Sequence, residues 1–297
     1  MIASYALAAR AMLPTPDTSH VSFDNVYEPA EDSYLFLDTL SSATESAFLK
    51  DRFSPVRNIT QSLEGIDSSP ENTGHGETPA LLACEIGAGS GVVLAFLTRH
   101  ADVILGRSDV MTLGTDVNEN ACRATQRTVP LAMSNNASEC SSSNSRNSRP
   151  CFLGAIKADL AGPLRSQSLD ILIFNPPYVP TDSVPAVPVH ASYNKGGTGD
   201  RYTDSFKLES DLLALSYAGG AHGMEVTDRL LDLIPELLDD ERGVAYVLLC
   251  AQNNPMEVKS RIRAWSGRWN AETVGLSGKT GGWEKLQIIR IWQVLAE

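Results

Sequence analysis

The chain has 297 residues, and its 36 acidic and 24 basic side chains give a formal net charge of −12 at neutral pH. This length suits one large α/β domain or two small ones, and we expect a tail over residues 1–23 and a single domain over 24–297 that carries insertions. The acidic balance argues against binding of long nucleic-acid tracts, because neutralising phosphates needs clustered cations.

The N-terminal stretch "MIASYALAARAMLPTPDTSH" has no leading positive region and carries an arginine in its middle. It is too short to span a bilayer and a poor match for a signal peptide, so no membrane contact is expected. The five cysteines are scattered and lack the close pairs of a zinc site, so we predict no metal site and a reducing compartment. We therefore expect a soluble cytoplasmic protein, and whether it also enters the nucleus stays open.

Residues 24–50 form an amphipathic preface to the domain. Within it, "EPAEDSYLFLDTL" (28–40) predicts a helix with an acidic N-cap and with Leu35, Leu37 and Leu40 available for packing. Such a helix either covers the core or closes over a ligand. The segments 55–79 and 134–150 are rich in Ser, Asn, Gly and Pro, and we predict that they are mobile surface insertions.

Strand-like apolar runs alternate with helical patterns along the rest of the chain. This alternation predicts an α/β fold with a mostly parallel sheet and helices on both faces. The helical patterns cover 91–100, 118–129 and 224–241. The expected strands are 81–87, 110–117, 151–159, 169–175, 243–250 and 284–294.

A glycine-rich loop, "EIGAGSG" (85–91), follows the first strand and precedes a helix. Gly87, Gly89 and Gly91 permit a tight turn and let backbone amides approach a ligand at the helix N-terminus. Such loops also occur as plain connectors between a strand and a helix. The loop becomes a candidate cofactor site only together with its neighbours.

Two further strands end in acidic residues at the same edge of the sheet. Asp116 ends the second strand, where a carboxylate can accept both hydroxyl protons of a ribose; alternatively, Asp116 and Asn118 cap the next helix. Asp159 ends the third strand. A cofactor laid across these strand ends accounts for all of these groups at once.

The nature of the cofactor is indicated by the glycine spacing and by Glu85. The G-x-G-x-G spacing is one residue shorter than the dinucleotide fingerprint. A carboxylate such as Glu85 suits a sulfonium with its amino group better than a pyrophosphate. S-adenosyl-L-methionine is therefore favoured over NAD.

The run "LDILIFNPPYVPT" (169–181) ends a buried strand in Asn175, Pro176, Pro177 and Tyr178. A planar amide or aromatic amine hides its nitrogen lone pair by conjugation, and two acceptors that bind its N–H groups orient that nitrogen for methyl transfer. The Asn175 carbonyl supplies one acceptor and a backbone carbonyl of the turn supplies the other, while Tyr178 offers a flat face for stacking. The bland alternative is that Pro-Pro merely breaks the strand and Asn175 starts a turn.

These residues resemble a known family. The motifs "VYEPAEDSYLFLDTL", "EIGAGSGVV", "TDVNENA", "FNPPYV", "YAGGAHGMEVTDRLL" and "NNPMEV" are similar to those of class I methyltransferases with the N-P-P-Y signature. More narrowly, the chain resembles the HemK-type glutamine methyltransferases of the eukaryotic and archaeal class 1 translation termination (release) factor over 26–295, apart from the two insertions. The resemblance implies a Rossmann-like, seven-stranded sheet without the helical N-terminal domain of the bacterial relatives.

The resemblance also implies a substrate, partners and contacts. The substrate would be the glutamine amide of the Gly-Gly-Gln loop of the release factor. A small zinc-binding activator subunit would form a heterodimer along the sheet edge, where "CFLGAIKA" (151–158) is expected. Cofactor contacts would fall on Ser33, Glu85, Gly87, Asp116, Asp159, Leu160 and Asn175, beside Gly89 and Gly91 of the loop, and substrate contacts on Asn175, Pro176, Pro177, Tyr178 and Val179.

Two other functions remain open from the sequence. An adenine N-methyltransferase acting on nucleic acid makes the same demands on an exocyclic amine, although the net charge argues against it. A non-catalytic scaffold that kept the fold is the other. The stretch 193–202 and His190 lie in plausible substrate-loop territory, but nothing assigns His190 as a base.

Overall fold

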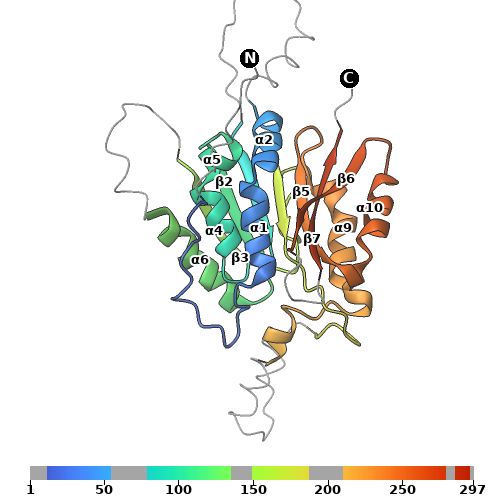
Figure 1. The fold of residues 1–297 in the computed structure, drawn as a ribbon. Coiled ribbons are helices and arrows are strands. Elements are labelled where there is room, and N and C mark those ends of the chain that lie inside the picture. Colours follow the sequence, from blue (N-terminus) through green and yellow to red (C-terminus); the bar gives the residue numbers. More distant parts are fainter. Residues whose placement is uncertain (1–11, 55–78, 135–148, 187–209, 279–284, 295–297) are drawn as a thin grey trace, which may run out of the picture.

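The protein's structure, a computed structural model, describes residues 12–54, 79–134, 149–186, 210–278 and 285–294 (Figure 1). Apart from a few flanking residues, both expected insertions lie outside this part of the chain, as do His190 and the stretch 193–202. In the described residues, no helix is both long and apolar enough to cross a membrane.

A seven-stranded sheet forms the centre of the molecule, in the order β3-β2-β1-β4-β5-β7-β6. The four pairings from β3 to β5 are parallel, and β7 is antiparallel to both β5 and β6. The expected Rossmann-like, mostly parallel architecture is therefore confirmed. The strands are β1 (Leu81–Ile86), β2 (Val110–Asp116), β3 (Cys151–Lys157), β4 (Ile171–Phe174), β5 (Val244–Cys250), β6 (Trp269–Leu276) and β7 (Leu286–Gln293).

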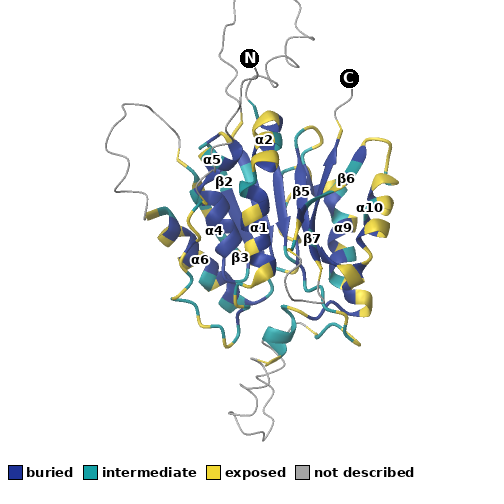
Figure 2. Cartoon of the chain, in the orientation of Figure 1, coloured by how far each residue is buried: buried dark blue, intermediate teal, exposed yellow. Residues whose placement is uncertain are grey.

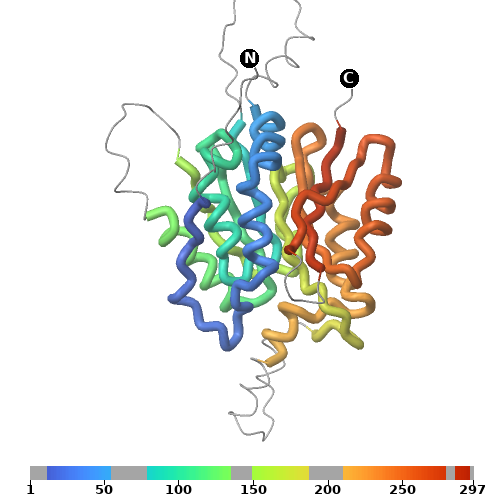
Figure 3. Tube along the Cα trace, in the orientation of Figure 1, coloured from blue at the N-terminus to red at the C-terminus, as the bar shows by residue number. Residues whose placement is uncertain are grey.

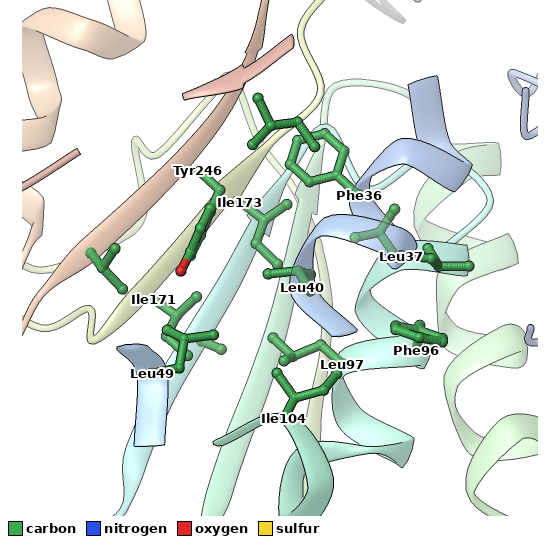
Figure 4. Close-up of a cluster of buried hydrophobic side chains, with 14 of the residues drawn as sticks. Phe36, Leu37, Leu40, Leu49, Phe96, Leu97, Ile104, Ile171, Ile173 and Tyr246 are labelled. Atoms are coloured by element: carbon green, nitrogen blue, oxygen red, sulfur yellow. The ribbon is translucent and has the colours of Figure 1, made fainter. Parts of the chain in front are cut away.

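Helices cover both faces of the sheet (Figure 1). Successive residues of a strand point to opposite faces, so Ile171 and Ile173 join one hydrophobic cluster while Leu172 and Phe174 join the other. The first cluster is covered by α1 (Glu31–Ser41), α2 (Ala43–Arg52), α4 (Val92–Arg99) and α5 (Ala101–Leu105); Figure 4 shows its central side chains. The second is covered by α9 (Glu225–Leu237) and α10 (Pro255–Arg263). Figure 2 shows that burial is concentrated in the strands and in the helix faces turned toward them.

Helix α6 (Glu119–Ser134) packs on α4 and on β3, and the segment before α1 lies against this pair. His20 Nε2 lies 3.1 Å from Thr128 Oγ1, and His100 Nε2 lies 3.1 Å from the carbonyl oxygen of Pro14. In Figure 3 this segment is the dark blue tube that leads to α1. Residues 12–26 are thereby tied to the outside of the domain.

The expectation for α1 is confirmed in its packing and wrong in its capping. Leu35, Leu37 and Leu40 are buried, as expected. The N-cap residue is Ala30, which makes no side-chain capping bond, and Glu31 and Asp32 lie in the first turn instead. The acidic residues there interact with the positive end of the helix rather than cap it.

Candidate functional site

A cavity lies at the carboxyl ends of the parallel strands, which is the lower end of the sheet in Figure 1. The ends of β1, β2 and β4 line it together with residues 158–160, which follow β3. Residues from α1, from the segment before α1 and from the start of α9 complete the wall. This is the edge where open α/β sheets bind their ligands.

The glycine loop enters the site because its backbone turns sharply between β1 and α4. Gly87, Gly89 and Gly91 have φ values of +66°, +54° and +79°, which side-chain-bearing residues rarely adopt. Gly87 and Gly89 line the cavity, and the N–H of Gly89 donates to Asp116 Oδ2 at 2.9 Å. Gly91 is not among the described lining residues; a Cβ there would lie 2.8 Å from the Cα of Thr125, so this glycine permits the close packing of α4 on α6.

Glu85 and Asp116 bring two acids to the floor of the site. Burial raises the pKa of Glu85 well above its ordinary value, and the nearby Asp116 adds to this, although the N–H of Leu94 donates to Glu85 Oε2 at 2.9 Å. Burial raises the pKa of Asp116 to about 6, against the opposing effect of the N–H groups of Asn118 and Gly89. Both acids would be stabilised in their charged form by a cationic ligand or by hydroxyl donors.

Asn118, rather than Asp116, caps α6. Asn118 Oδ1 accepts from the N–H of Asn120 at 2.9 Å, and its amide donates to the carbonyl of Asn25 at 2.6 Å. Asp116 instead bonds the N–H groups of Asn118 and Gly89, so it links the loop after β1 to the loop after β2. Its carboxylate remains at the cavity wall with lone pairs available for a ribose.

The residues after β3 form the third side of the cavity. Asp159 Oδ2 pairs with the guanidinium of Arg229, from α9, at 2.6 Å. Leu160 has a φ of +50°, and its carbonyl accepts from Thr115 Oγ1 at 2.9 Å. Both residues line the cavity, as expected.

Asn175 carries the feature that is most informative about substrate. Its Oδ1 is buried and has no hydrogen-bond partner in the part of the chain that the structure describes. Buried carbonyl oxygens are almost always paired, so an orphan at the wall of a cavity is typical of a position that a ligand completes. Pro176 and Pro177 line the cavity beside it.

Tyr178 and Val179 do not line this cavity in the described residues. The ring of Tyr178 is half-buried and packs against the hydrophobic cluster under α1. Val179 is held by backbone bonds to the segment before α9. The stacking and substrate contacts expected of these two residues stay predictions.

Several lining residues were not predicted as site residues from the sequence. Asp32 sits beside the expected Ser33 at the start of α1, and both its carboxylate contacts are local, to the N–H and Oγ of Ser33. Some of the others lie in the motifs that carry the family resemblance, and the rest come from segments that the sequence pattern does not connect to the site. They are Val26, Tyr27, Thr115, Val184, Pro185, Leu212, Leu215, Ser216, Val226 and Arg229.

Three proteins similar to this chain are all named as methyltransferases. No family model matches the chain. It is 30% identical over 290 residues to "Methyltransferase HEMK2" of Mus musculus, covering 95% of this chain and 98% of that protein. It is 29% identical over 284 residues to "Methyltransferase HEMK2" of Homo sapiens, covering 93% and 95%. It is 29% identical over 286 residues to "eRF1 methyltransferase catalytic subunit mtq2" of Schizosaccharomyces pombe, covering 95% and 97%.

Proposed function

Because the chain belongs to the HEMK2 family of methyltransferases, we propose that it methylates the glutamine side-chain amide of the Gly-Gly-Gln motif in the class 1 translation release factor. The chain is an S-adenosylmethionine-dependent methyltransferase, and it is the substrate that is proposed here. One relative is named for acting on eRF1, which supports this choice.

The residues around the cavity fit S-adenosylmethionine. The Asp116 carboxylate stands at the end of β2, where a ribose needs acceptors, and Glu85 places an acid on the floor of the site, where a cation is accommodated. Ser33 and Asp159 are further polar residues at the wall, and Leu160 lies beside them. When bound, the cofactor supplies an electrophilic methyl group on a positively charged sulfur.

The observation that carries the substrate class is the orphaned Asn175 Oδ1. An amide N–H that donates to this oxygen regains the hydrogen bond that the buried carbonyl lacks. A second acceptor, from the backbone of the proline turn, holds the other N–H, so the nitrogen is fixed in orientation. Transfer forms a carbon–nitrogen bond as the carbon–sulfur bond breaks, and the nitrogen gives up one proton to solvent.

The test uses recombinant protein, purified release factor and cofactor carrying a labelled methyl group. Label is expected on the wild-type factor and on no factor whose Gly-Gly-Gln glutamine is replaced by alanine, with peptide mapping placing one methyl on that glutamine. Equal labelling of the alanine factor, or none on the wild type, contradicts the proposed substrate. Labelling of DNA or RNA at physiological salt would instead favour an adenine substrate.

A partner subunit is part of the same proposal. The name "catalytic subunit" implies at least one further chain in the fission yeast relative. In this structure β3 is one of the two edge strands and, among the described residues, pairs only with β2, while Leu153 and Ile156 are 52% and 40% exposed. Since an uncovered apolar edge strand favours association, a small zinc-binding activator that pairs along β3 is the partner we propose.

A further inference from the structure

The backbone of the N-P-P-Y turn is held from outside the cavity by the side chain of Asn253. Asn253 ends a short turn after β5 (η2, Ala251–Asn253), is 2% exposed and is absent from the described residues that line the cavity. Its Oδ1 accepts from the N–H of Cys250 at 2.7 Å. Because that partner can only donate, the orientation of the amide is settled and its NH₂ group faces the opposite way.

The NH₂ group of Asn253 meets carbonyls from two separate segments. It donates to the carbonyl of Tyr178 at 3.1 Å, to that of His222 at 3.0 Å and to that of Gly223 at 3.3 Å. Two N–H groups are thus shared among three acceptors, in a buried position where an unpaired carbonyl is costly. One side chain therefore joins the N-P-P-Y turn to the segment before α9.

The joined segments are in close contact throughout. The N–H of Val179 donates to the carbonyl of Tyr217 at 3.0 Å, and the N–H of Gly219 donates to the carbonyl of Val179 at 2.8 Å. A Cβ on Gly223 would lie 2.0 Å from the carbonyl oxygen of Tyr178, so no side chain fits between them. The Tyr178 carbonyl therefore faces Gly223 and Asn253.

The prolines alone do not fix this geometry. A proline ring locks φ and also restricts ψ of the residue before it, so Asn175 and Pro176 are held extended, but ψ of Pro177 and Tyr178 is not fixed by the prolines. These ψ angles decide where the carbonyls at the end of the turn point. The Tyr178 carbonyl is held by Asn253 and the Val179 carbonyl by the N–H of Gly219, so the second acceptor beside Asn175 Oδ1 comes from the earlier carbonyls of the turn, 175 to 177. We infer that Asn253 is a positioning residue for methyl transfer: through the Tyr178 carbonyl it sets the direction of the turn's acceptors toward the substrate nitrogen. The inference rests on the proposed amide substrate only for the identity of that nitrogen.

The deciding variant is Asn253→Asp in the full chain. It keeps the size of the side chain and the acceptor for Cys250, and it replaces two donors by an oxygen that repels three carbonyls. Since misplacing reacting groups by about 1 Å costs about 100-fold in rate, kcat should fall by about 10- to 100-fold. The dissociation constant for S-adenosylmethionine should stay within about 3-fold, because Asn253 lies outside the cavity.

Two further readouts separate positioning from general stability. The ratio of variant to wild-type kcat should increase as the pH is lowered, since the introduced carboxyl regains an O–H donor on protonation. A crystal structure of the variant should show the Tyr178 carbonyl displaced while the sheet is unchanged. The matched control is Asn254→Asp, the exposed neighbour whose amide donates to Glu257, and it should leave kcat within about 2-fold.

A folded Asn253→Asp variant with wild-type kcat, or one whose kcat and cofactor affinity fall equally, overturns the inference. If this variant does not fold, Asn253→Ser, which keeps one donor, is measured in the same way and should show an intermediate kcat. A wild-type protein that leaves the release factor unlabelled refutes the proposed substrate instead. The position of the Tyr178 carbonyl in the variant structure then decides the role of Asn253 by itself.

Discussion

At the scale of single residues, the carboxamide of Asn175 leaves a buried oxygen without a partner among the described residues. Such an oxygen weakens the free protein and is satisfied only when an N–H donor binds. Replacing Asn175 by Ala should therefore keep the free energy of unfolding level or raise it, by about 1 kcal/mol at most. The same change should lower kcat about 100- to 1,000-fold, because an acceptor that orients the nitrogen is lost.

Urea unfolding and methyl-transfer kinetics test this pair of effects. The control is Asn118→Ala, at another asparagine of the cavity wall, whose Oδ1 caps α6 and whose amide nitrogen donates to the carbonyl of Asn25. That change should lower the free energy of unfolding by about 1 kcal/mol. Equal destabilisation by both substitutions would mean that the Asn175 carbonyl has a partner in the free protein.

The acidity of Asp116 makes cofactor affinity depend on pH. Burial raises the pKa of this carboxyl to about 6, and only its ionised form is a full acceptor for ribose hydroxyls. As the pH falls below 6 the group is protonated, so the dissociation constant should increase about tenfold per pH unit. Calorimetric titration with S-adenosylhomocysteine measures this dissociation constant at each pH, and the neutral sulfur of that ligand limits the contribution of Glu85. The Asp116→Asn variant should bind the ligand more weakly, and its dissociation constant should not change with pH. A flat wild-type profile between pH 5 and 7 would show that Asp116 does not bind the ribose.

At the scale of elements, the central strands and the edge strand β3 were predictable, whereas the edge strand β6 was not. The runs that became β1, β4 and β5 are buried on both faces, so they appear in the sequence as unbroken apolar stretches. Strand β6 is an edge strand whose burial is interrupted by exposed and half-buried residues, and its sequence "WNAETVGL" shows no such stretch. No apolar run in the sequence predicts helix α10 either. This helix starts with Pro255, directly after Asn254, whose φ is +50°.

The residues of the candidate site also fall into those that the sequence predicts and those that it does not. Glu85, Asp116 and Asn175 were predictable because each follows an apolar strand, and parallel strands bring their ends together. Arg229 and Leu212 reach the cavity from segments that come much later in the chain, and Arg229 is brought there by the packing of α9 against the sheet. Asn253 lies in the motif "NNPMEV", but its contact with Tyr178 depends on a turn geometry that the pattern of apolar residues in the sequence does not predict.

The packing of α4 on α6 gives a test at this scale. Gly91 has a φ of +79°, and a Cβ there would lie 2.8 Å from the Cα of Thr125. Gly91→Ala should lower the free energy of unfolding by about 2–4 kcal/mol, from backbone strain and overpacking together. Gly267→Ala, where nothing lies within 4 Å of the added methyl, should change it by less than about 0.5 kcal/mol in the same urea titration. A comparable loss at both positions would contradict the packing explanation.

The two edge strands allow a matched test of the partner surface. Introducing Leu153→Lys and Ile156→Lys on β3 should abolish co-purification with the activator and leave cofactor affinity unchanged, because charges on an edge strand oppose pairing. Leu276→Lys, on the opposite edge strand β6 and 69% exposed, should leave co-purification intact. Loss of the partner from the β6 variant alone would move the interface to that edge.

At the scale of the whole molecule, the cavity and the contacts that join the two halves of the chain lie in different parts of the sheet. The carboxyl ends of the parallel strands hold the cavity, whereas buried ions tie the N-terminal helices to the C-terminal half of the sheet on one of its faces. Arg52, at the end of α2, donates to the carbonyls of Glu241, Arg242, Gly243 and Gln293. These bonds join residues about 190 or more positions apart in the chain, so the first helices fold onto strands that come last.

The centre of this junction is a buried ionic network. Arg290 of β7 donates to both carboxylate oxygens of Glu45 at 2.9 Å, and its guanidinium lies 3.6 Å from the ring centroid of Phe48. The hydroxyl of Tyr246, in β5, donates to Glu45 Oε1 at 2.5 Å, and burial raises the pKa of this tyrosine well above its ordinary value. Glu45 is 2% exposed, so these partners replace the water that would otherwise hydrogen-bond to its carboxylate.

Removing Glu45 and Arg290 together should lower the free energy of unfolding by less than the sum of the two single removals. Arg290→Met leaves a buried carboxylate without its cation, and the free energy of unfolding should fall by about 3–5 kcal/mol. Adding Glu45→Leu removes the uncompensated charge, so the double variant should be less destabilised than the sum of the two single variants by about 0.5–3 kcal/mol. Urea unfolding of the four proteins in this cycle measures the difference.

The control is Arg123→Met, which breaks an exposed ion pair with Glu119 on α6. It should lower the free energy of unfolding by less than about 1 kcal/mol and sets the scale for a surface pair. Additive single effects would show that the junction is held by packing around Phe48 and Trp292 rather than by charge.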